Sequence, residues 1–437
     1  MTTVDRRGCA ITGATPAALD SYERALAAWQ AWRRDDDTAL QGARREAPGF
    51  VMAHAFTAWQ LATTRDVRRV AAARPIVAGA LRLPANERER MHLAALSAVL
   101  DDDFEGAKAR LGRLLDRWPR DAIALGVAHS LDHVTGDVAR MRRRVERAMP
   151  AWSRNDPGYH ALLAMHAFAL AESGAYTRAE AAAHAPSGAY TRAEAAAHAA
   201  LELHPLDARA CHAMAHVFEM TDRYAAGVRW MSEHAGAWAI RSTVVTHGWW
   251  HVALFHLSAH ESERALALYD THVRGERSGE VSDLIDASAL LWRIALAGRN
   301  PGARWGELAD AWSVHIDDAF CSFSDVHAML AFVGASDRDR ARRLETELSR
   351  RQSFATRYGK TTRQLGLPAC RALVAFGRGD DAAAIKGLAR LPSIAHRLGG
   401  SHAQRDVLHL TLQHAVQRAR RPSRWGAPVF ARFAVPA

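Results

Sequence analysis

Apolar residues recur along this chain at helical spacing, in segments separated by short turns that contain proline. In the segment DFEGAKARLGRLLDRWPRD, the aromatic Phe104 is followed by the small Ala107, by further apolar positions, and then by Pro119 and Asp121. This spacing predicts an amphipathic helix, because side chains three and four positions apart lie on the same helix face. Proline cannot continue a helix interior, so the turn at Pro119 marks the end of this helix.

The same pattern returns elsewhere in the chain. It recurs 86 residues later as Tyr190, Ala193, Pro205 and Asp207. Prolines also punctuate the chain in steps of 36, 35 and 38 residues, at Pro48, Pro84, Pro119 and Pro157. A period of about 36–38 residues predicts an all-α fold, a TPR-like α-solenoid of antiparallel helical hairpins, in which each hairpin buries its apolar face against its neighbours.

One irregular step in this series has a visible cause. Pro205 follows Pro157 by 48 residues because the letters SGAYTRAEAAAHA occupy residues 173–185 and again residues 187–199. This is a 14-residue tandem duplication within residues 173–200, and removing one copy shortens the step to 34 residues. Because Pro186, Ser187 and Gly188 should break the helix after the first copy, we expect an extra short helix or loop there.

The repeats predict one helical array over residues 1–412. The remaining residues, 413–437, contain the Arg- and Pro-rich segment RRPSRWGAPVFARFAVPA. We expect them to form an atypical C-terminal tail, since proline interrupts the helical pattern there.

Histidines follow the same period. His54, His92, His129 and His166 are separated by 38, 37 and 37 residues, and His216, His251 and His327 continue the series with one rung missing. As far as His216, each lies about 6–11 residues after a repeat proline, within the first helix of its hairpin. First helices usually line the concave surface of such arrays, which predicts a histidine-lined groove. The alternative is that these imidazoles pack between helices and bond backbone carbonyls.

Two of these histidines, His216 and His251 in the middle of the array, each have a second histidine four positions earlier in the sequence. CHAMAHVFEM places His212, His216 and Glu219 on one helix face, and THGWWHVALFH places His247 and His251 on one face of another helix. Imidazoles at this spacing near a carboxylate suit a transition metal or an acid/base pair. A polar helix interface with satisfied hydrogen bonds is the structural alternative.

Several of these segments resemble the tetratricopeptide repeat protein 38 family, and the likeness covers nearly the whole chain. It rests on FVMAHA at His54, RERMHLAAL at His92, HAMAHVFEM at His216, THGWWHVAL at His251 and FSDVHAML at His327, and it extends to GGSHAQRDV near the C-terminus. The resemblance implies a soluble TPR-like α-solenoid and carries no settled activity. The duplication and the Pro-rich C-terminal segment depart from the family pattern.

The resemblance also implies which residues occupy family motif positions. They are His54, His92, His129, His212, His216, Glu219, His247, His251, Asp270, His272, Asp325 and His327, together with Gln404, Arg405 and Asp406. Asp270 and Asp325 could each orient the histidine two positions later only at a helix end, because helical residues at i and i+2 point to different sides. Ser324 or Asp325 is well placed to start the helix that carries His327. Ser401 is well placed to cap the helix that begins directly after it.

The amino-acid composition and the absence of certain motifs argue against several classes of function. The net charge is +10, but only three of the 57 basic residues are lysines, and the arginines alternate with acidic residues, so nucleic acid is not expected as a partner. No Gly-rich phosphate loop and no GxSxG motif occurs. The four cysteines are far apart and no apolar stretch could span a membrane, which predicts a cytoplasmic protein with reduced thiols.

Two functional hypotheses follow. The first is a repeat protein that binds a small molecule, peptide or protein segment on a concave surface lined by histidine and by Trp250, with Arg405 as a candidate anion contact. The second is an enzyme or metal-dependent small-molecule-binding protein that uses the central cluster. Its candidate metal ligands are His212, His216, His247 and His251. The sequence predicts no catalytic residue and leaves the oligomeric state open.

Overall fold

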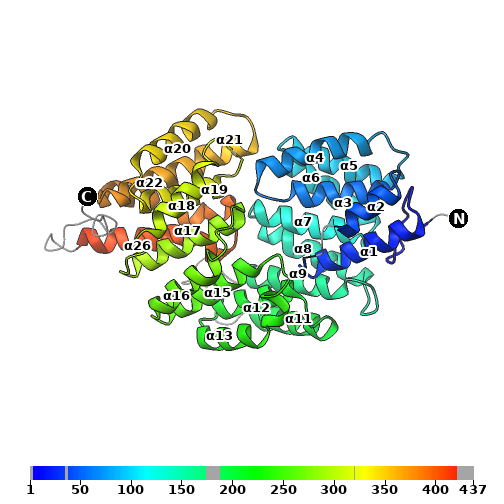
Figure 1. The fold of residues 1–437 in the computed structure, drawn as a ribbon, viewed down its shortest axis with the longest axis horizontal. Coiled ribbons are helices and arrows are strands. Elements are labelled where there is room, and N and C mark those ends of the chain that lie inside the picture. Colours follow the sequence, from blue (N-terminus) through cyan, green and yellow to red (C-terminus); the bar gives the residue numbers. More distant parts are fainter. Residues whose placement is uncertain (1–2, 35–37, 174–187, 319, 421–437) are drawn as a thin grey trace. The chain divides into compact units, whose positions relative to one another are not determined.

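Helices make up the regular structure of the described chain. The computed structural model describes residues 3–34, 38–173, 188–318 and 320–420, and within these ranges it contains helices and no strands (Figure 1). The predicted all-α class is confirmed, and the packing of successive helices is consistent with a helical solenoid. None of the helices in these ranges has both the length and the apolar character needed to cross a bilayer.

Contacts between helices divide the chain into two compact units. The first comprises residues 1–223 and 229–245, and the second comprises residues 224–228 and 246–437. The helix α13 (Tyr224–Glu233) contributes to both. The array predicted over residues 1–412 spans both units.

The first unit is built from helical hairpins. Its helices are α1 (Pro16–Gln30), α2 (Thr38–Glu46), α3 (Val51–Ala62), α4 (Val67–Ala80), α5 (Glu87–Leu100), α6 (Phe104–Arg117), α7 (Ala122–Val134), α8 (Val138–Ala148), α9 (Tyr159–Ser173), α11 (Ala189–Leu203), α12 (Ala208–Met220) and α14 (Ala235–Trp238), with a short 3-10 turn at Met149–Ala151. Each odd-numbered helix from α1 to α7 packs on the next helix, and α9 packs on α11. The predicted period therefore corresponds to one hairpin.

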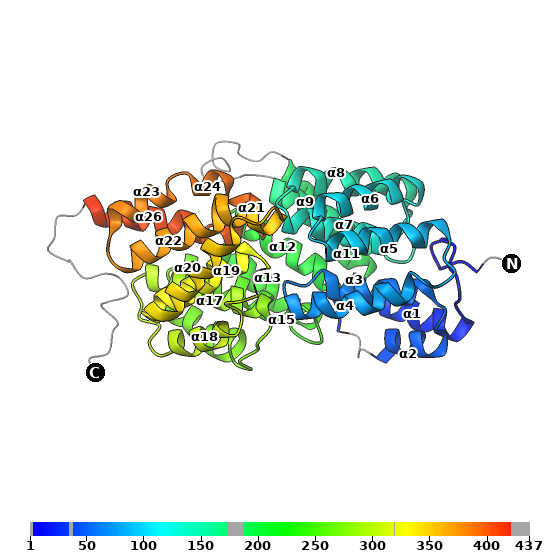
Figure 2. The same cartoon turned by 90° about the horizontal axis from the view of Figure 1, so that it is seen from above.

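The second unit continues the pattern. Its elements are α15 (Val245–Ser258), α16 (Ser262–Leu268), the π-helix η2 (Tyr269–Val273), α17 (Val281–Leu296), α18 (Arg304–Ser313), α19 (Ser322–Gly334), α20 (Arg338–Arg351), α21 (Arg357–Thr361), the π-helix η3 (Thr362–Gly366), α22 (Leu367–Gly377), α23 (Asp381–Leu388), α24 (Leu391–Ile394), the 3-10 helix η4 (Ala395–Leu398), α25 (His402–Arg405) and α26 (Val407–Arg420). Figure 2 shows α22, α23 and α26 side by side, in agreement with their contacts.

The aspartate that follows the repeat proline has a clear structural role. Asp121 is the N-cap of α7 and accepts a hydrogen bond from the backbone N–H of Ala124, and Asp207 caps α12 in the same way. A carboxylate at this position satisfies backbone donors that the first helical turn leaves unpaired. The recurring Pro and Asp therefore end one hairpin and start the next.

Small and aromatic residues fill the interior of the second unit. Trp292 and Trp312 are both buried, and their indole N–H groups donate to the hydroxyls of Thr411 and Ser288 at 2.9 and 2.8 Å. Buried tryptophan needs such a partner because an unpaired N–H costs free energy. The contact to Thr411 ties α26 to α17 and so holds the last described helix on the core.

Two predicted boundaries can be compared with the structure. The second copy of the duplication forms α11, whereas the extra helix or loop expected after the first copy lies outside the described residues. The C-terminal tail was expected from residue 413, but α26 continues to Arg420. The segment LHLTLQHAVQRAR keeps the helical spacing of apolar residues up to that point, and Pro422 is the first residue that would break it.

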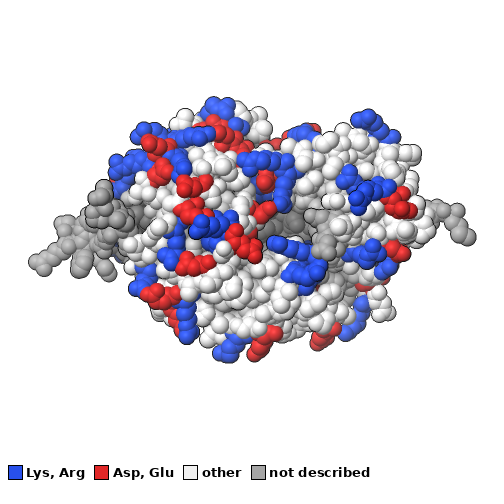
Figure 3. All heavy atoms as spheres, viewed as in Figure 1, with Lys and Arg blue, Asp and Glu red and all other residues white. Residues whose placement is uncertain are grey.

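Surface charge is mixed in sign. Figure 3 shows arginine and lysine side chains interspersed with aspartate and glutamate on the visible face. This face therefore shows no single dominant basic patch.

Candidate functional site

The histidine pair of the first unit lies on α12. The Nε2 atoms of His212 and His216 are 3.0 Å apart, as expected for side chains one helical turn apart. His216 is buried, and His212 is half-buried beside the indole of Trp32, with ring centroids 5.2 Å apart. Asp207, the N-cap of α12, fixes the start of this helix and so the direction in which the pair projects.

A buried carboxylate lies behind this pair. Oε1 of Glu172, at the end of α9, lies 3.3 Å from Nδ1 of His216, and both side chains are almost fully buried. A carboxylate on one ring nitrogen orients the imidazole and makes the other nitrogen a better electron-pair donor. The predicted Glu219 is also buried and lies on the same helix, one turn beyond His216.

The histidine pair of the second unit lies on α15. The rings of His247 and His251 have their centroids 4.8 Å apart at an interplanar angle of 80°. Trp250, which lies between them in the sequence, is buried. Its ring stacks on that of His247, with centroids 5.1 Å apart and planes 15° apart. Its indole N–H has no hydrogen-bond partner among the described residues.

This pair also has a buried carboxylate behind it. Nδ1 of His247 lies 2.7 Å from Oδ2 of Asp286 on α17, and Asp286 is 2% exposed. The amide of Gln404 donates to the other oxygen of Asp286 at 3.1 Å. Donation of the Nδ1 proton to Asp286 favours the tautomer of neutral His247 in which Nε2 is the acceptor.

The two pairs share a chemical arrangement. In each, two imidazoles lie one helical turn apart, and the Nδ1 atom of one faces a buried carboxylate. Neutral imidazole nitrogen is a common ligand of zinc, copper, nickel and iron. The candidate metal ligands in the described part of the chain are the imidazoles of these two pairs.

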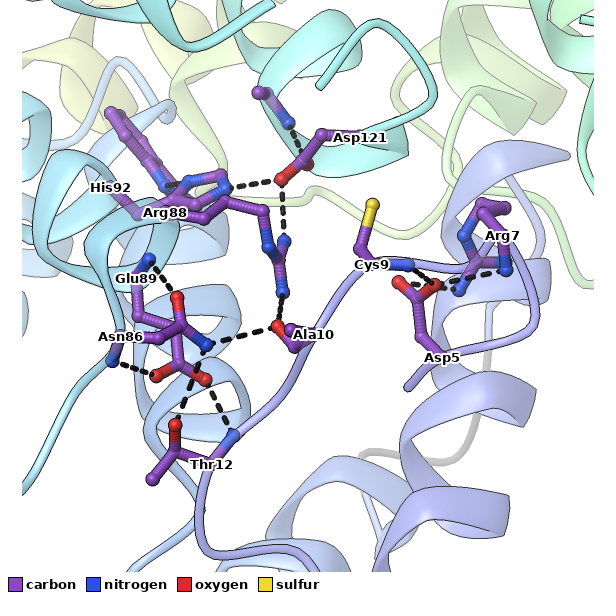
Figure 4. A network of polar contacts seen from close by, with 12 residues as sticks. Asp5, Arg7, Cys9, Ala10, Thr12, Asn86, Arg88, Glu89, His92 and Asp121 are labelled. Carbon is purple, nitrogen blue, oxygen red and sulfur yellow. Dashed lines mark hydrogen bonds and ion pairs between the residues drawn. The ribbon is translucent and has the colours of Figure 1, made fainter. Parts of the chain in front are cut away.

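His92 has a different role. Its Nδ1 accepts a hydrogen bond from the indole of Trp59 at 3.1 Å, and its Nε2 lies 2.9 Å from Oδ2 of Asp121. Arg88 also binds this oxygen, at 2.5 Å (Figure 4). Burial alone would raise the pKa of Asp121, but His92 and Arg88 outweigh it and hold that pKa well below its usual value. Both ring nitrogens of this buried histidine are thus used within the fold.

The same network anchors the N-terminal segment. Arg88 and Asn86 both donate to the carbonyl of Ala10, and Glu89 accepts from the backbone N–H of Thr12 (Figure 4). Cys9 lies in this region, and its burial, together with Asp121 and Asp5, raises its pKa to about 12. A thiol with such a pKa remains protonated at neutral pH and is a poor nucleophile.

Two other rungs bond backbone carbonyls. His129 is buried with Nε2 3.2 Å from the carbonyl of Met165, and His327 is buried with Nδ1 2.7 Å from the carbonyl of Phe323. Burial and the nearby Arg209 and His133 hold the pKa of His129 well below its ordinary value. Both residues act as polar groups within helix packing.

These positions correct the expectation of an open groove lined by imidazoles. The periodically spaced histidines do lie on the first helices of hairpins, as predicted, but most of their side chains are buried in the packed interior. Five of the seven rungs are less than 9% exposed: His92, His129, His216, His251 and His327. The physical reason is that the same period places these histidines on the helix face that carries the apolar residues.

The remaining predicted residues lie apart from the pairs or at their edge. His272 is exposed and stacks on Trp249, with centroids 3.9 Å apart. Asp270 forms an ion pair with Arg304 rather than orienting His272. Arg405, on α25, donates to the carbonyl of Gly400 next to the capping residue Ser401. Ser401 caps α25 as predicted.

Asp325 is a buried acid of the second unit. It is not the predicted helix start, because α19 begins at Ser322, three residues earlier. Tyr358 donates a hydrogen bond to its Oδ2 at 2.9 Å. Burial raises the pKa of Asp325 to about 7, although this hydrogen bond acts in the opposite direction.

Sequence reasoning missed the two carboxylates behind the pairs. Glu172 and Asp286 lie on other helices than the histidines that they contact, and no fixed spacing announces them. One signal was present, since Asp286 interrupts the apolar run of VSDLIDASALLWRIAL. An acid on the apolar face of a helix needs a partner in the fold.

The fold and these contacts define an all-helical protein of packed hairpins with two carboxylate-backed histidine pairs. No family model matches the chain.

Proposed function

We propose that the histidine pair of α12 and the histidine pair of α15 are each, within their own unit, a binding site for a first-row transition metal ion. The observation that carries the proposal is the pairing of each set with a buried carboxylate, Glu172 behind His216 and Asp286 behind His247. In metal sites, such carboxylates orient the ligating imidazole and fix its tautomer.

The burial of the pairs supports the same conclusion. His216 and His251 are both fully buried, and a buried imidazole nitrogen is stabilised by a hydrogen-bond partner or by a metal cation. The pairs contain imidazole only, without thiolates, and this donor set suits Zn²⁺, Cu²⁺ and Ni²⁺ better than Mg²⁺ or Ca²⁺.

We further propose that the hairpins are of the tetratricopeptide type and that the chain is related to the tetratricopeptide repeat protein 38 family. Support comes from the sequence motifs that carry the resemblance, which lie on α3, α5, α12, α15 and α19. These helices hold His54, His92, both histidine pairs and His327.

Metal analysis of the purified chain tests the proposal. Protein prepared without chelator is assayed by elemental analysis, and chelator-treated protein is titrated with Zn²⁺, Ni²⁺ or Cu²⁺ by calorimetry. We expect at least one equivalent of metal per chain and a lower melting temperature after chelation, because an ion that binds the folded state stabilises it.

Variants of the half-buried members of the pairs make the test specific. His212→Gln and His247→Gln each keep a polar side chain, so the fold is retained while a ligand is lost. Each should weaken metal binding by about 10-fold or more. The matched controls His198→Gln and His409→Gln replace histidines outside the pairs. Metal content below a tenth of an equivalent, or equal affinity in all four variants, would reject the proposal.

A further inference from the structure

A large cavity in the first unit is lined by basic side chains. Its volume is about 1060 Å³, and α1, α2, α3, α4, α7 and α12 contribute to its walls. The arginines that line it are Arg33, Arg34, Arg44, Arg45, Arg69 and Arg209. His54, one of the residues predicted for ligand binding, lies in the same wall. A volume of this size is sufficient for a small organic ligand.

The described walls of this cavity contain no aspartate or glutamate. The three aspartates at positions 35–37 follow Arg34 in the chain and lie outside the described residues. Elsewhere in the first unit, the buried cations have carboxylate partners: Arg7 pairs with Glu23, and Arg88 with Asp121. Among the described residues, the cavity wall therefore presents arginine side chains and no carboxylate.

Arg209 shows this difference most clearly. It is 4% exposed and forms no ion pair with a carboxylate among the described residues. Its Nε donates to the carbonyl of Gln30 at 3.2 Å, and its guanidinium stacks on the ring of Trp32, 4.5 Å from the centroid. Burial lowers the pKa of Arg209 to about 10, although Asp207 acts to raise it. A buried cation without a direct ion pair is costly, and an anion in the cavity would offset that cost.

Two further arginines of the cavity have neutral partners. Arg44 donates from Nε to Nδ1 of His54 at 3.2 Å, and Arg33 donates to the carbonyl of Ala237 at 2.6 Å. Nε2 of His54 in turn lies 2.9 Å from the carbonyl of Pro48. His54 therefore uses its Nδ1 lone pair to hold Arg44, and it acts here as a positioning residue.

We propose that this cavity binds a phosphorylated small molecule. Arginine presents a planar fork of N–H donors that matches the oxygens of phosphate, and several such forks suit an anion with two or more charges. Trp29, Trp32, Leu61 and Ile76 supply apolar wall for an organic part of the ligand. None of the four histidines of the pairs lines the cavity, so this proposal stands independently of the metal proposal.

The test is a calorimetric titration with inorganic pyrophosphate, with sulfate and citrate as comparison anions at equal ionic strength. The protein is first treated with chelator and dialysed, because pyrophosphate and citrate bind metal ions. We expect pyrophosphate to bind at sub-millimolar Kd and at least about 10-fold more tightly than sulfate or citrate. Tighter binding of citrate would overturn the phosphate assignment, and no binding of pyrophosphate at 10 mM, an excess of roughly tenfold or more over the expected Kd, would overturn the proposal.

Charge-neutralising variants locate the binding. Arg34→Gln with Arg45→Gln removes two exposed charges from the cavity wall and should raise the pyrophosphate Kd by about 10-fold or more. The matched control, Arg113→Gln with Arg154→Gln, removes two exposed charges of the same unit outside the cavity and should change Kd by less than about twofold. Arg209→Lys keeps the buried charge but loses the fork, and it should weaken binding as strongly as the first pair. Equal effects of the cavity and control pairs would contradict the assignment.

Discussion

Oδ2 of Asp286 lies 2.7 Å from Nδ1 of His247, and the two residues belong to α17 and α15. Gln404 donates to the other oxygen, so the carboxylate is held from both sides. Asp286→Asn keeps the size of the side chain but removes its negative charge, and so weakens its hydrogen bond with the imidazole of His247. We expect metal affinity to fall by about 10- to 100-fold, as for other carboxylates that support ligating histidines.

Competition with a chelating dye measures this change, and the melting temperature of metal-free protein checks the fold. Asp339→Asn, an exposed aspartate on α20, serves as the control and should leave affinity unchanged. Unaltered affinity in Asp286→Asn would show that this carboxylate does not support a metal ligand.

His92, unlike Asp286, should affect the stability of the fold and not the binding of metal. His92→Ala leaves the indole N–H of Trp59 without its acceptor and removes one of the partners of Asp121. We expect the free energy of unfolding to fall by about 2–5 kcal/mol, with no change in metal or pyrophosphate affinity. Urea unfolding followed by circular dichroism measures the stability. The exposed His198→Ala should cost less than about 0.5 kcal/mol, and a similarly small cost for His92→Ala would contradict the structural role given to this residue.

The contrast between these histidines shows what the sequence could predict. The spacing of prolines and histidines predicted the hairpins and the helix on which each rung lies, because helix period and chain breaks are local properties. It also placed His212 beside His216 and His247 beside His251, since residues four apart share a helix face. The direction of each rung was harder to read, because a histidine on the apolar face of a helix can serve either packing or ligand binding.

The residues that contact these histidines lie far from them in the sequence, so they could not be predicted from it. Asp286 is 39 residues from His247, Glu172 is 44 residues from His216, and Gln404 is 118 residues from Asp286. No single-helix pattern encodes such pairs. The resemblance to a known family supplied Gln404 as a motif position but gave it no role. The arginine-lined cavity gathers residues from six helices that no motif connects.

Gly126 controls the position of a cavity wall. A Cβ atom at this position would lie 2.4 Å from Cη2 of Trp29, which lines the cavity and lies 5.9 Å from the guanidinium of Arg209. Gly126→Ala must therefore displace the indole, and we expect a loss of about 1–3 kcal/mol in the free energy of unfolding and weaker binding of pyrophosphate. In the control Gly112→Ala, the added Cβ meets its nearest neighbour at 3.6 Å, an ordinary contact.

Because alanine has the higher helix propensity, Gly112→Ala should be neutral or more stable by up to about 1 kcal/mol. Thermal unfolding and calorimetry measure the two quantities. A Gly126→Ala protein as stable as the Gly112→Ala protein would show that Trp29 can move without cost.

Asp325 should make stability depend on pH in an unusual direction. Burial raises its pKa to about 7, whereas an aspartate in an unfolded chain ionises near pH 4. Between these two values the folded chain holds a proton that the unfolded chain has lost, so the free energy of unfolding decreases as the pH rises. The contribution is fully present below about pH 4 and is lost above about pH 7, and it amounts to about 2–4 kcal/mol.

Asp325→Asn removes the titrating group and can still accept the hydrogen bond from Tyr358. Urea unfolding at pH 5, 6, 7 and 8 should therefore show a smaller decrease in stability with pH for Asp325→Asn than for the parent chain. The difference between the two profiles isolates Asp325 from the other titrating groups. Asp339→Asn should reproduce the parent profile, because this side chain is exposed. Parallel profiles for the parent and Asp325→Asn would mean that this buried acid is ionised in the folded chain throughout the range.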